Sequence, residues 1–147
     1  MFDKLNLKNH PTILVLEAPA SFEPELAALH GVTVVRSLHP LDTIDFSLAF
    51  VTTQKELDTL AAAIAERAQG DAVVWFAYPK ATSKRYKSEI HRDTGWQALG
   101  EAGFEPVRAI AIDEDWTALR FRRVEFIKTM TRAKEHRMTA QGKGRPK

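Results

Sequence analysis

Short apolar runs alternate with amphipathic stretches along most of the chain. Several of these runs are rich in β-branched or aromatic residues and predict strands: 12–16, 32–36, 46–52 and 72–78. Thr53 and Glu56 have the spacing of a capping box, and apolar residues then recur at helical spacing up to Gly70. Strands that alternate with helices in this way are typical of a parallel sheet.

Two further helices are predicted from capping residues and glycines. Ser21 is a suitable cap for a helix over 22–29, which a glycine follows closely. Either Asp93 or Thr94 caps another helix, which stops at Gly103. Each predicted helix therefore lies between two predicted strands.

The last two strands complete the predicted fold. Residues 107–113 and 116–122 are close enough in the sequence to form a hairpin, so the final strand runs antiparallel to its neighbour. We therefore expect a three-layer α-β-α protein. Its open, mostly parallel sheet should have about six strands, with an antiparallel C-terminal hairpin strand.

Composition separates one expected domain, 1–127, from a tail. Residues 128–147 hold seven Lys or Arg and one acid, and we expect them to form a flexible basic tail. The absence of cysteine excludes disulfides, zinc–thiolate sites and thiolate nucleophiles, and it makes the cytoplasm the default compartment. Neither a signal peptide nor an apolar run of membrane-spanning length is present, so we expect no membrane partner.

Two motifs carry a resemblance to a known family. Residues 75–80 read Trp-Phe-Ala-Tyr-Pro-Lys, and residues 112–121 read Ile-Asp-Glu-Asp-Trp-Thr-Ala-Leu-Arg-Phe. They resemble an uncharacterised bacterial family, domain of unknown function 3052, and the similarity spans nearly all of 1–123. Many members carry a second lysine after the first motif, where this chain has Ala81. The resemblance implies an α/β fold and no particular activity.

The carboxyl ends of parallel strands meet at one edge of a sheet, where open α/β folds bind ligands. We expect that edge to hold 17–21, Thr52, Thr53, the loop 80–87 and the turn 113–115. The loop carries four cations and two hydroxyls, which suit a phosphate or a carboxylate. The predicted ligand-binding residues belong to this loop, the turn and the last strand: Lys80, Thr82, Ser83, Lys84, Asp113, Asp115, Trp116 and Arg120.

Structural roles are the alternative for each of these residues. The loop is otherwise a solvated surface in which Lys80 pairs with an acid of the turn. The acids of the turn either ligate Mg²⁺ or form a plain hairpin turn. Trp116 and Arg120 share one face of their strand, where they line a pocket or stack as a cation–π pair. The five histidines lack metal-ligand spacing, so no metal centre is expected.

The turn after the first strand, 17–21, contains no glycine. Dinucleotide sites need glycines there so that the backbone can approach a pyrophosphate. The predicted strand order is similar to that of methyltransferases that use S-adenosylmethionine, but their glycine-rich turn is also missing. We therefore expect no cofactor, and neither S-adenosylmethionine nor a nicotinamide dinucleotide should bind.

Three functions fit these observations. The preferred one is a domain that binds a small anionic ligand without catalytic machinery, because no catalytic constellation is recognisable. The second is an enzyme acting on a phosphorylated or carboxylated substrate, with Lys80 holding the anion and Asp113 or Asp115 as acid, base or metal ligand. The third is an interaction module whose basic tail contacts nucleic acid or another acidic partner.

Overall fold

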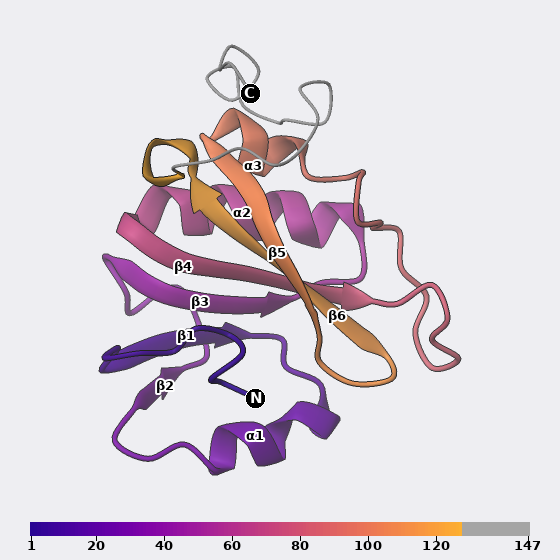
Figure 1. Ribbon diagram of the computed structural model, residues 1–147, viewed down its shortest axis with the longest axis horizontal. Coiled ribbons are helices and arrows are strands. Elements are labelled where there is room, and N and C mark those ends of the chain that lie inside the picture. Colours follow the sequence, from indigo (N-terminus) through magenta and orange to yellow (C-terminus); the bar gives the residue numbers. More distant parts are fainter. Residues whose placement is uncertain (128–147) are drawn as a thin grey trace.

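A six-stranded sheet organises residues 1–127, which are the residues described by the computed structural model (Figure 1). Its strands, in chain order, are β1 (Thr12–Leu16), β2 (Thr33–Val35), β3 (Ile44–Phe50), β4 (Ala68–Pro79), β5 (Phe104–Ala111) and β6 (Trp116–Arg123). They lie in the order β2-β1-β3-β4-β6-β5. The predicted tail, 128–147, lies outside the described residues.

The strands β2, β1, β3 and β4 are mutually parallel, and β6 is inserted antiparallel between β4 and β5. The turn between β5 and β6 is short, so the chain reverses direction there and β6 pairs with both neighbours. The expected fold class is therefore confirmed: an open, mostly parallel sheet with an antiparallel C-terminal hairpin strand.

Helices cover the two faces of the sheet and produce the three layers. On one face, α2 (Gln54–Arg67) and α3 (Gln97–Glu101) contribute Leu57, Ile64 and Leu99 to a core with the alternate residues of β4 and β6. On the other face, η1 (Ala20–Phe22) and α1 (Glu23–Ala27) pack with the N-terminal segment. The indole Nε1 of Trp75 donates to the carbonyl of Leu5 over 2.7 Å and fixes that segment to the sheet.

The capping box predicted for the longest helix is confirmed. Thr53 accepts from the backbone N–H of Glu56, and the Glu56 carboxylate accepts from the backbone N–H of Thr53. The helix ends at Arg67, earlier than its periodicity predicts, and β4 begins at once with Ala68. Gly70, at φ +57°, lies where the pairing register between β3 and β4 shifts, a conformation that favours glycine.

The two shorter helices begin without the predicted side-chain caps. Phe22 precedes α1 and Trp96 precedes α3, and neither supplies a capping hydrogen bond. Ser21 lies instead in the 3₁₀ turn η1, and Thr94 pairs with His91 in an isolated bridge. Packing of these helices on the sheet replaces the local signal. Within residues 1–127, no helix has the length and apolar character needed to span a membrane.

Candidate functional site

The topology of the sheet marks one point at which a ligand site is expected. From β1 the chain moves to β2 at one edge, whereas from β3 it moves to β4 in the opposite direction. The helices that follow β1 and β3 consequently pack on opposite faces, and a crevice opens between the carboxyl ends of these two strands. Ligands of open α/β sheets bind at such a switch point.

A cavity of about 370 Å³ lies at this switch point. Its lining comes from the end of β1, the residue before α2 and the first two turns of α2: Leu16, Glu17, Thr53, Lys55, Glu56, Thr59 and Leu60. Small-molecule sites have volumes of about 300–1,000 Å³ and combine apolar surface with a few polar groups. The switch-point cavity, as we call it, has the size and lining of such a site.

Glu17 occupies a special backbone position at the mouth of this cavity. It is the first residue after β1 and has φ +58°, in the left-handed region that non-glycine residues rarely adopt. Dinucleotide-binding turns place their first glycine after β1 to make the same kind of tight turn. The tight turn is therefore kept in this chain, but it carries an exposed carboxylate side chain in place of bare backbone.

Glu56 supplies a second carboxylate to the lining. Burial raises the pKa of Glu56, but hydrogen bonds from the backbone N–H and hydroxyl groups of Thr52 and Thr53 outweigh it, and the pKa is lowered overall. All four bonds reach Oε1 over 3.0–3.2 Å. Glu56 is consequently an anion at neutral pH, and its position is fixed by the capping box.

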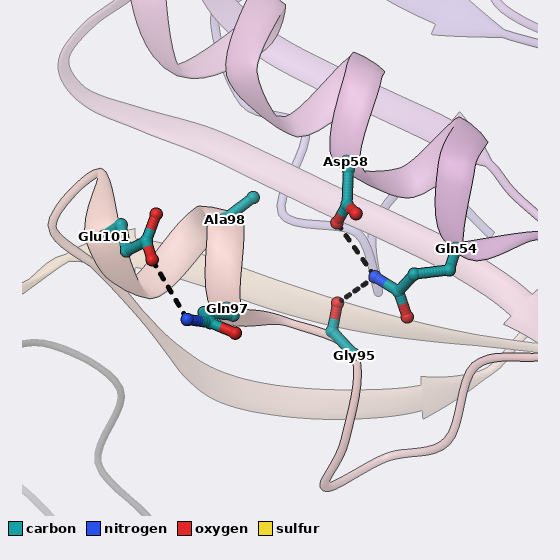
Figure 2. Close-up of a pocket in the computed structure, with 6 residues that line it drawn as sticks. All are labelled: Gln54, Asp58, Gly95, Gln97, Ala98 and Glu101. Carbon is teal, nitrogen blue, oxygen red and sulfur yellow. Dashed lines mark hydrogen bonds between the residues drawn. The ribbon is translucent and has the colours of Figure 1, made fainter.

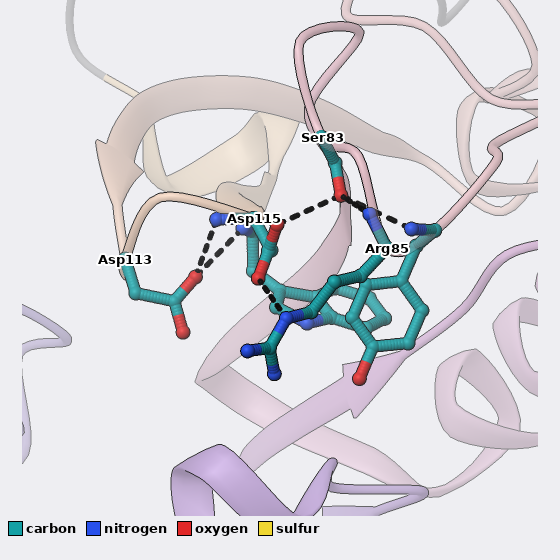
Figure 3. A network of polar contacts seen from close by, with 6 residues as sticks. Ser83, Arg85, Asp113 and Asp115 are labelled. Atoms are coloured by element: carbon teal, nitrogen blue, oxygen red, sulfur yellow. Dashed lines mark hydrogen bonds and ion pairs between the residues drawn. The ribbon is translucent and has the colours of Figure 1, made fainter.

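The predicted ligand-binding residues are partly gathered at another point of the same edge, the turn between β5 and β6 (Figure 3). The Ser83 hydroxyl donates to Asp115 Oδ1 over 2.9 Å, and Arg85 Nε lies 4.0 Å from Asp115 Oδ2. The backbone N–H of Lys80 donates to the Asp115 carbonyl over 2.8 Å. Asp113 Oδ1 accepts from two backbone N–H groups of the turn, those of Asp115 and Trp116.

We call these residues, Lys80, Ser83, Arg85, Asp113 and Asp115, the turn cluster. Its carboxylates already accept from neighbouring groups, which supports the hairpin-turn alternative for Asp113. No group of three or more metal-ligating side chains occurs within residues 1–127. Among residues 1–127, the Lys80 ammonium forms no ion pair with an acid of the turn. Arg85 pairs with Asp115 instead.

The other predicted site residues lie apart from one another. Thr82 and Lys84 are exposed on the loop. Trp116 is buried, with ring centroids 5.2 Å from Phe50 and 5.0 Å from Tyr86. Arg120 lies further along β6, in register with Trp75, and burial lowers its pKa.

The cation–π pair suggested for Trp116 and Arg120 is not formed. Trp116 packs against aromatic rings instead, because its strand position places it over the core between β3 and the loop that follows β4. The cation–π contact recorded among residues 1–127 joins Arg123 to Phe104, 4.6 Å from the ring centroid. The two-residue period itself is confirmed, since Leu119 and Phe121 belong to the core on the opposite face.

A second cavity, of about 350 Å³, lies between α2 and α3 (Figure 2). Its polar groups bind one another: Gln54 Nε2 donates to Asp58 over 2.8 Å and to the Gly95 carbonyl over 2.7 Å, and Gln97 donates to Glu101 over 3.1 Å. The lining comes from α2, from α3 and from Gly95 in the loop before α3, and not from strand ends. This cavity is therefore a poorer candidate than the switch-point cavity.

Comparison with known proteins gives the fold a class. No family model matches the chain, and no curated protein matches it. Among solved structures, a SAM-dependent methyltransferase from Aquifex aeolicus is similar with a TM-score of 0.56 and 16% identity, covering 84% of this chain and 87% of that one. The N-methyltransferase NodS from Bradyrhizobium japonicum has a TM-score of 0.51 and 12% identity, over 82% and 90% of the two chains.

A third structure extends the same comparison. Magnesium protoporphyrin IX methyltransferase from Synechocystis, with bound SAH, has a TM-score of 0.53 and 13% identity, over 83% of this chain and 78% of that one. At these identities the likeness shows a shared fold alone, an open Rossmann-like α/β sheet. The resemblance to the uncharacterised bacterial family stays a prediction.

The comparisons correct the preferred functional prediction. A small anionic-ligand-binding domain, with an anion as its partner, is contradicted because the three similar structures described above are methyltransferases, and the one from Synechocystis is known with bound SAM and with bound SAH. The alternatives of an enzyme for phosphorylated or carboxylated substrates and of a nucleic-acid-binding tail find no support there either. The physical reason is that the loop after β4 directs Ser83 and Arg85 to the Asp115 carboxylate of the protein itself.

The sequence had placed Glu17 and Thr53 at the ligand edge without assigning them to a site. It gave no sign of Lys55, Thr59 and Leu60, whose side chains reach the cavity from α2. The available signal was the reversal of strand order between β1 and β3, which predicts the crevice.

Proposed function

We propose that this protein is a methyltransferase that binds S-adenosylmethionine in the switch-point cavity. The observation that carries the proposal is the position of the cavity, at the carboxyl ends of β1 and β3 in a sheet of the methyltransferase kind. The likeness to solved methyltransferases over more than four-fifths of the chain supports it.

The lining of the cavity fits this ligand in three respects. Leu16 and Leu60 provide apolar surface for an adenine ring. The hydroxyl of Thr59 offers a hydrogen-bonding group to ribose. The carboxylates of Glu17 and Glu56 attract the positive charges of an amino group and a sulfonium. When bound, S-adenosylmethionine would supply an electrophilic methyl group.

The proposal reverses the expectation drawn from the missing glycines. Pro19 lacks an N–H, so the turn after β1 offers one backbone amide fewer than a glycine-rich turn does. The acid that binds ribose about 20 residues later in dinucleotide folds is also absent. Arg36 follows β2 here and pairs with Glu23 over 2.8 Å. Side chains of the cavity must therefore replace these backbone and acidic contacts.

Isothermal titration calorimetry of the full chain with S-adenosylmethionine tests the proposal. We expect a dissociation constant in the micromolar range for the wild type. Thr59→Trp should fill the cavity and weaken binding at least tenfold, because a bulky ring occupies the ligand's volume. Thr82→Trp is the matched control, since Thr82 is equally exposed but lies on the loop after β4.

Absence of binding to the wild type would overturn the proposal. Loss of affinity in Thr82→Trp with unchanged affinity in Thr59→Trp would move the ligand to the turn cluster. Melting temperatures of both variants equal to that of the wild type would show that neither result comes from unfolding. The cytoplasm remains the predicted compartment, and fractionation with an antibody against the chain checks it.

A further inference from the structure

We infer that the part of the sheet formed by Arg108, Arg120 and Arg122 binds an acidic segment of a partner protein. These three residues, which we call the arginine face, lie on the neighbouring strands β5 and β6. None of them lines the switch-point cavity, so the inference goes beyond the proposed function and names a second surface.

Strand register brings the three arginines together. Trp116 and Ala118 pack into the core on the side of η1 and α1, so the two-residue period places Arg120 and Arg122 on that same side of β6. Arg108 of β5 is directly opposite Arg120. No helix of the described chain lies over this part of β5 and β6, since α1 lies toward β1 and β2 (Figure 1). The arginine face is therefore an open part of the sheet.

The positive charge of this face is only partly compensated. Asp71 accepts from Arg122 Nε and Nη2 over 2.8 and 2.7 Å, and the buried Glu105 is opposite Arg122 in the register. In contrast, Arg108 and Arg120 form no ion pair within the described part of the chain. Like charges directly opposite each other across two strands destabilise a sheet. A carboxylate between these two guanidiniums would remove the repulsion and accept hydrogen bonds from both.

Arg120 also has a donor without an acceptor. Its Nε is buried and has no hydrogen-bond partner among residues 1–127. A buried N–H without an acceptor costs free energy, and native structures rarely contain one. Burial lowers the pKa of Arg120, and the charges of Arg122 and Arg108 also lower it, against the opposite effect of Asp71. An acceptor from another molecule would therefore stabilise this guanidinium.

The surroundings favour a protein segment over a nucleic acid or a second copy of the chain. Ile110 and Ile112 follow Arg108 along the same face and are only partly buried, and apolar surface beside arginine is typical of protein interfaces. Trp75, which is opposite Arg120, is buried and offers no ring for base stacking. A second copy related by a two-fold axis would oppose arginines to arginines.

Titration of the isotope-labelled full chain with a short synthetic peptide of alternating Glu and Leu, followed by nuclear magnetic resonance, tests the inference. The amides of Ile110 and Ala118, which pair beside the arginines, should shift, and they report on this face rather than on the basic residues 128–147. A peptide with Gln in place of Glu should leave them unchanged. In Arg108→Gln and in Arg120→Gln the dissociation constant should rise at least about fivefold, as expected for partly exposed ion pairs.

Arg92→Gln is the matched control. Arg92 is exposed in the loop before α3 and also forms no ion pair within residues 1–127. An equal loss of affinity in this variant would assign the effect to net charge and overturn the inference. Arg108→Gln and Arg120→Gln should melt at or above the wild-type temperature, because each removes a repulsion. Lower melting temperatures would show that these arginines support the fold, which would also overturn it.

The remaining outcomes decide between partners. Absence of shifts with the Glu–Leu peptide, or unchanged affinity in both variants, would contradict the inference. Shifts of the same amides by oligouridylate at lower concentrations than by the peptide would assign the face to nucleic acid instead. Shifts that depend on the concentration of the chain alone would assign it to a second copy. None of these results depends on S-adenosylmethionine, so the proposed function stands or falls separately.

Discussion

The carboxyl edge of the sheet contains two regions of opposite character. The turn cluster has many polar groups, and its carboxylates are bound by the neighbouring hydroxyl, guanidinium and backbone groups. The switch-point cavity has fewer polar groups, but it has volume, and Glu17 has no partner there within residues 1–127. The charged residues are therefore concentrated in the region whose carboxylates already have hydrogen-bond partners. The topology of the sheet predicts the other region, where a cavity is open to a ligand.

The two regions should also respond differently to mutation. The side chains of the turn cluster that form hydrogen bonds within it stabilise the hairpin, so their removal should reduce stability and leave ligand affinity unchanged. Residues of the cavity should change ligand affinity, and those that also shape the turn or cap the helix should change stability as well. Four measurements examine this contrast, beginning with the largest expected effect.

Asp113→Ala should destabilise the fold by about 1–3 kcal/mol, because the backbone N–H of buried Trp116 and that of Asp115 lose their acceptor. Urea unfolding followed by fluorescence measures the change. Glu114→Ala, in the same turn and exposed, is the control and should change stability by less than about 0.5 kcal/mol. If Asp113→Ala instead abolished binding of S-adenosylmethionine at unchanged stability, the assignment of the two regions would be reversed.

Glu17→Gly should raise the free energy of unfolding by up to about 1 kcal/mol. The left-handed conformation costs an L-residue about 1–2 kcal/mol, and the added entropy of unfolded glycine offsets part of the gain. Asn6→Gly is the matched comparison: Asn6 has φ 64°, but asparagine tolerates this region, so the gain should be smaller. A lower stability of Glu17→Gly would show that the Glu17 side chain supports the turn.

The stability contributed by the capping box should depend on pH. Because the pKa of Glu56 is lowered in the folded state, its contribution is fully present above the ordinary value of 4.5 and is lost as pH falls below it, through the folded pKa. Unfolding of the wild type and of Glu56→Gln at pH 7 and pH 3 should converge at the lower pH. Because solvent screens this partly exposed carboxylate, the difference in unfolding free energy between the wild type and Glu56→Gln at pH 7 should be under about 1 kcal/mol. A difference that grew on acidification would contradict this sign.

Lys80→Ala should have the smallest effect, under about 0.5 kcal/mol. The contact of Lys80 with the turn is its backbone N–H, which alanine retains, and its ammonium forms no ion pair with the acids there. Thermal melting of the variant beside the wild type measures the change. A loss above about 1 kcal/mol would indicate a charge interaction with the turn that the structure does not contain.

Local patterns determined much of the fold from the sequence alone. The strand at 12–16, the capping box at Thr53 and the antiparallel last strand each follow from short-range rules of burial, hydrogen bonding and turn length. The caps predicted at Ser21 and Thr94 were wrong because packing on the sheet, rather than a side-chain bond, begins those short helices.

The sequence also placed Glu17 and Thr53 at the carboxyl edge, since parallel strands end on the same side. Only the tertiary structure decided that β6 lies between β4 and β5 and that the Asp115 carboxylate accepts from Ser83. It also decided that Thr59 of α2 lines the same cavity as Glu17. Secondary structure depends on neighbours in the chain, which a sequence displays. A cavity depends on which distant side chains meet and on the volume they leave unfilled, and this is fixed only when the strands are ordered and the helices are packed.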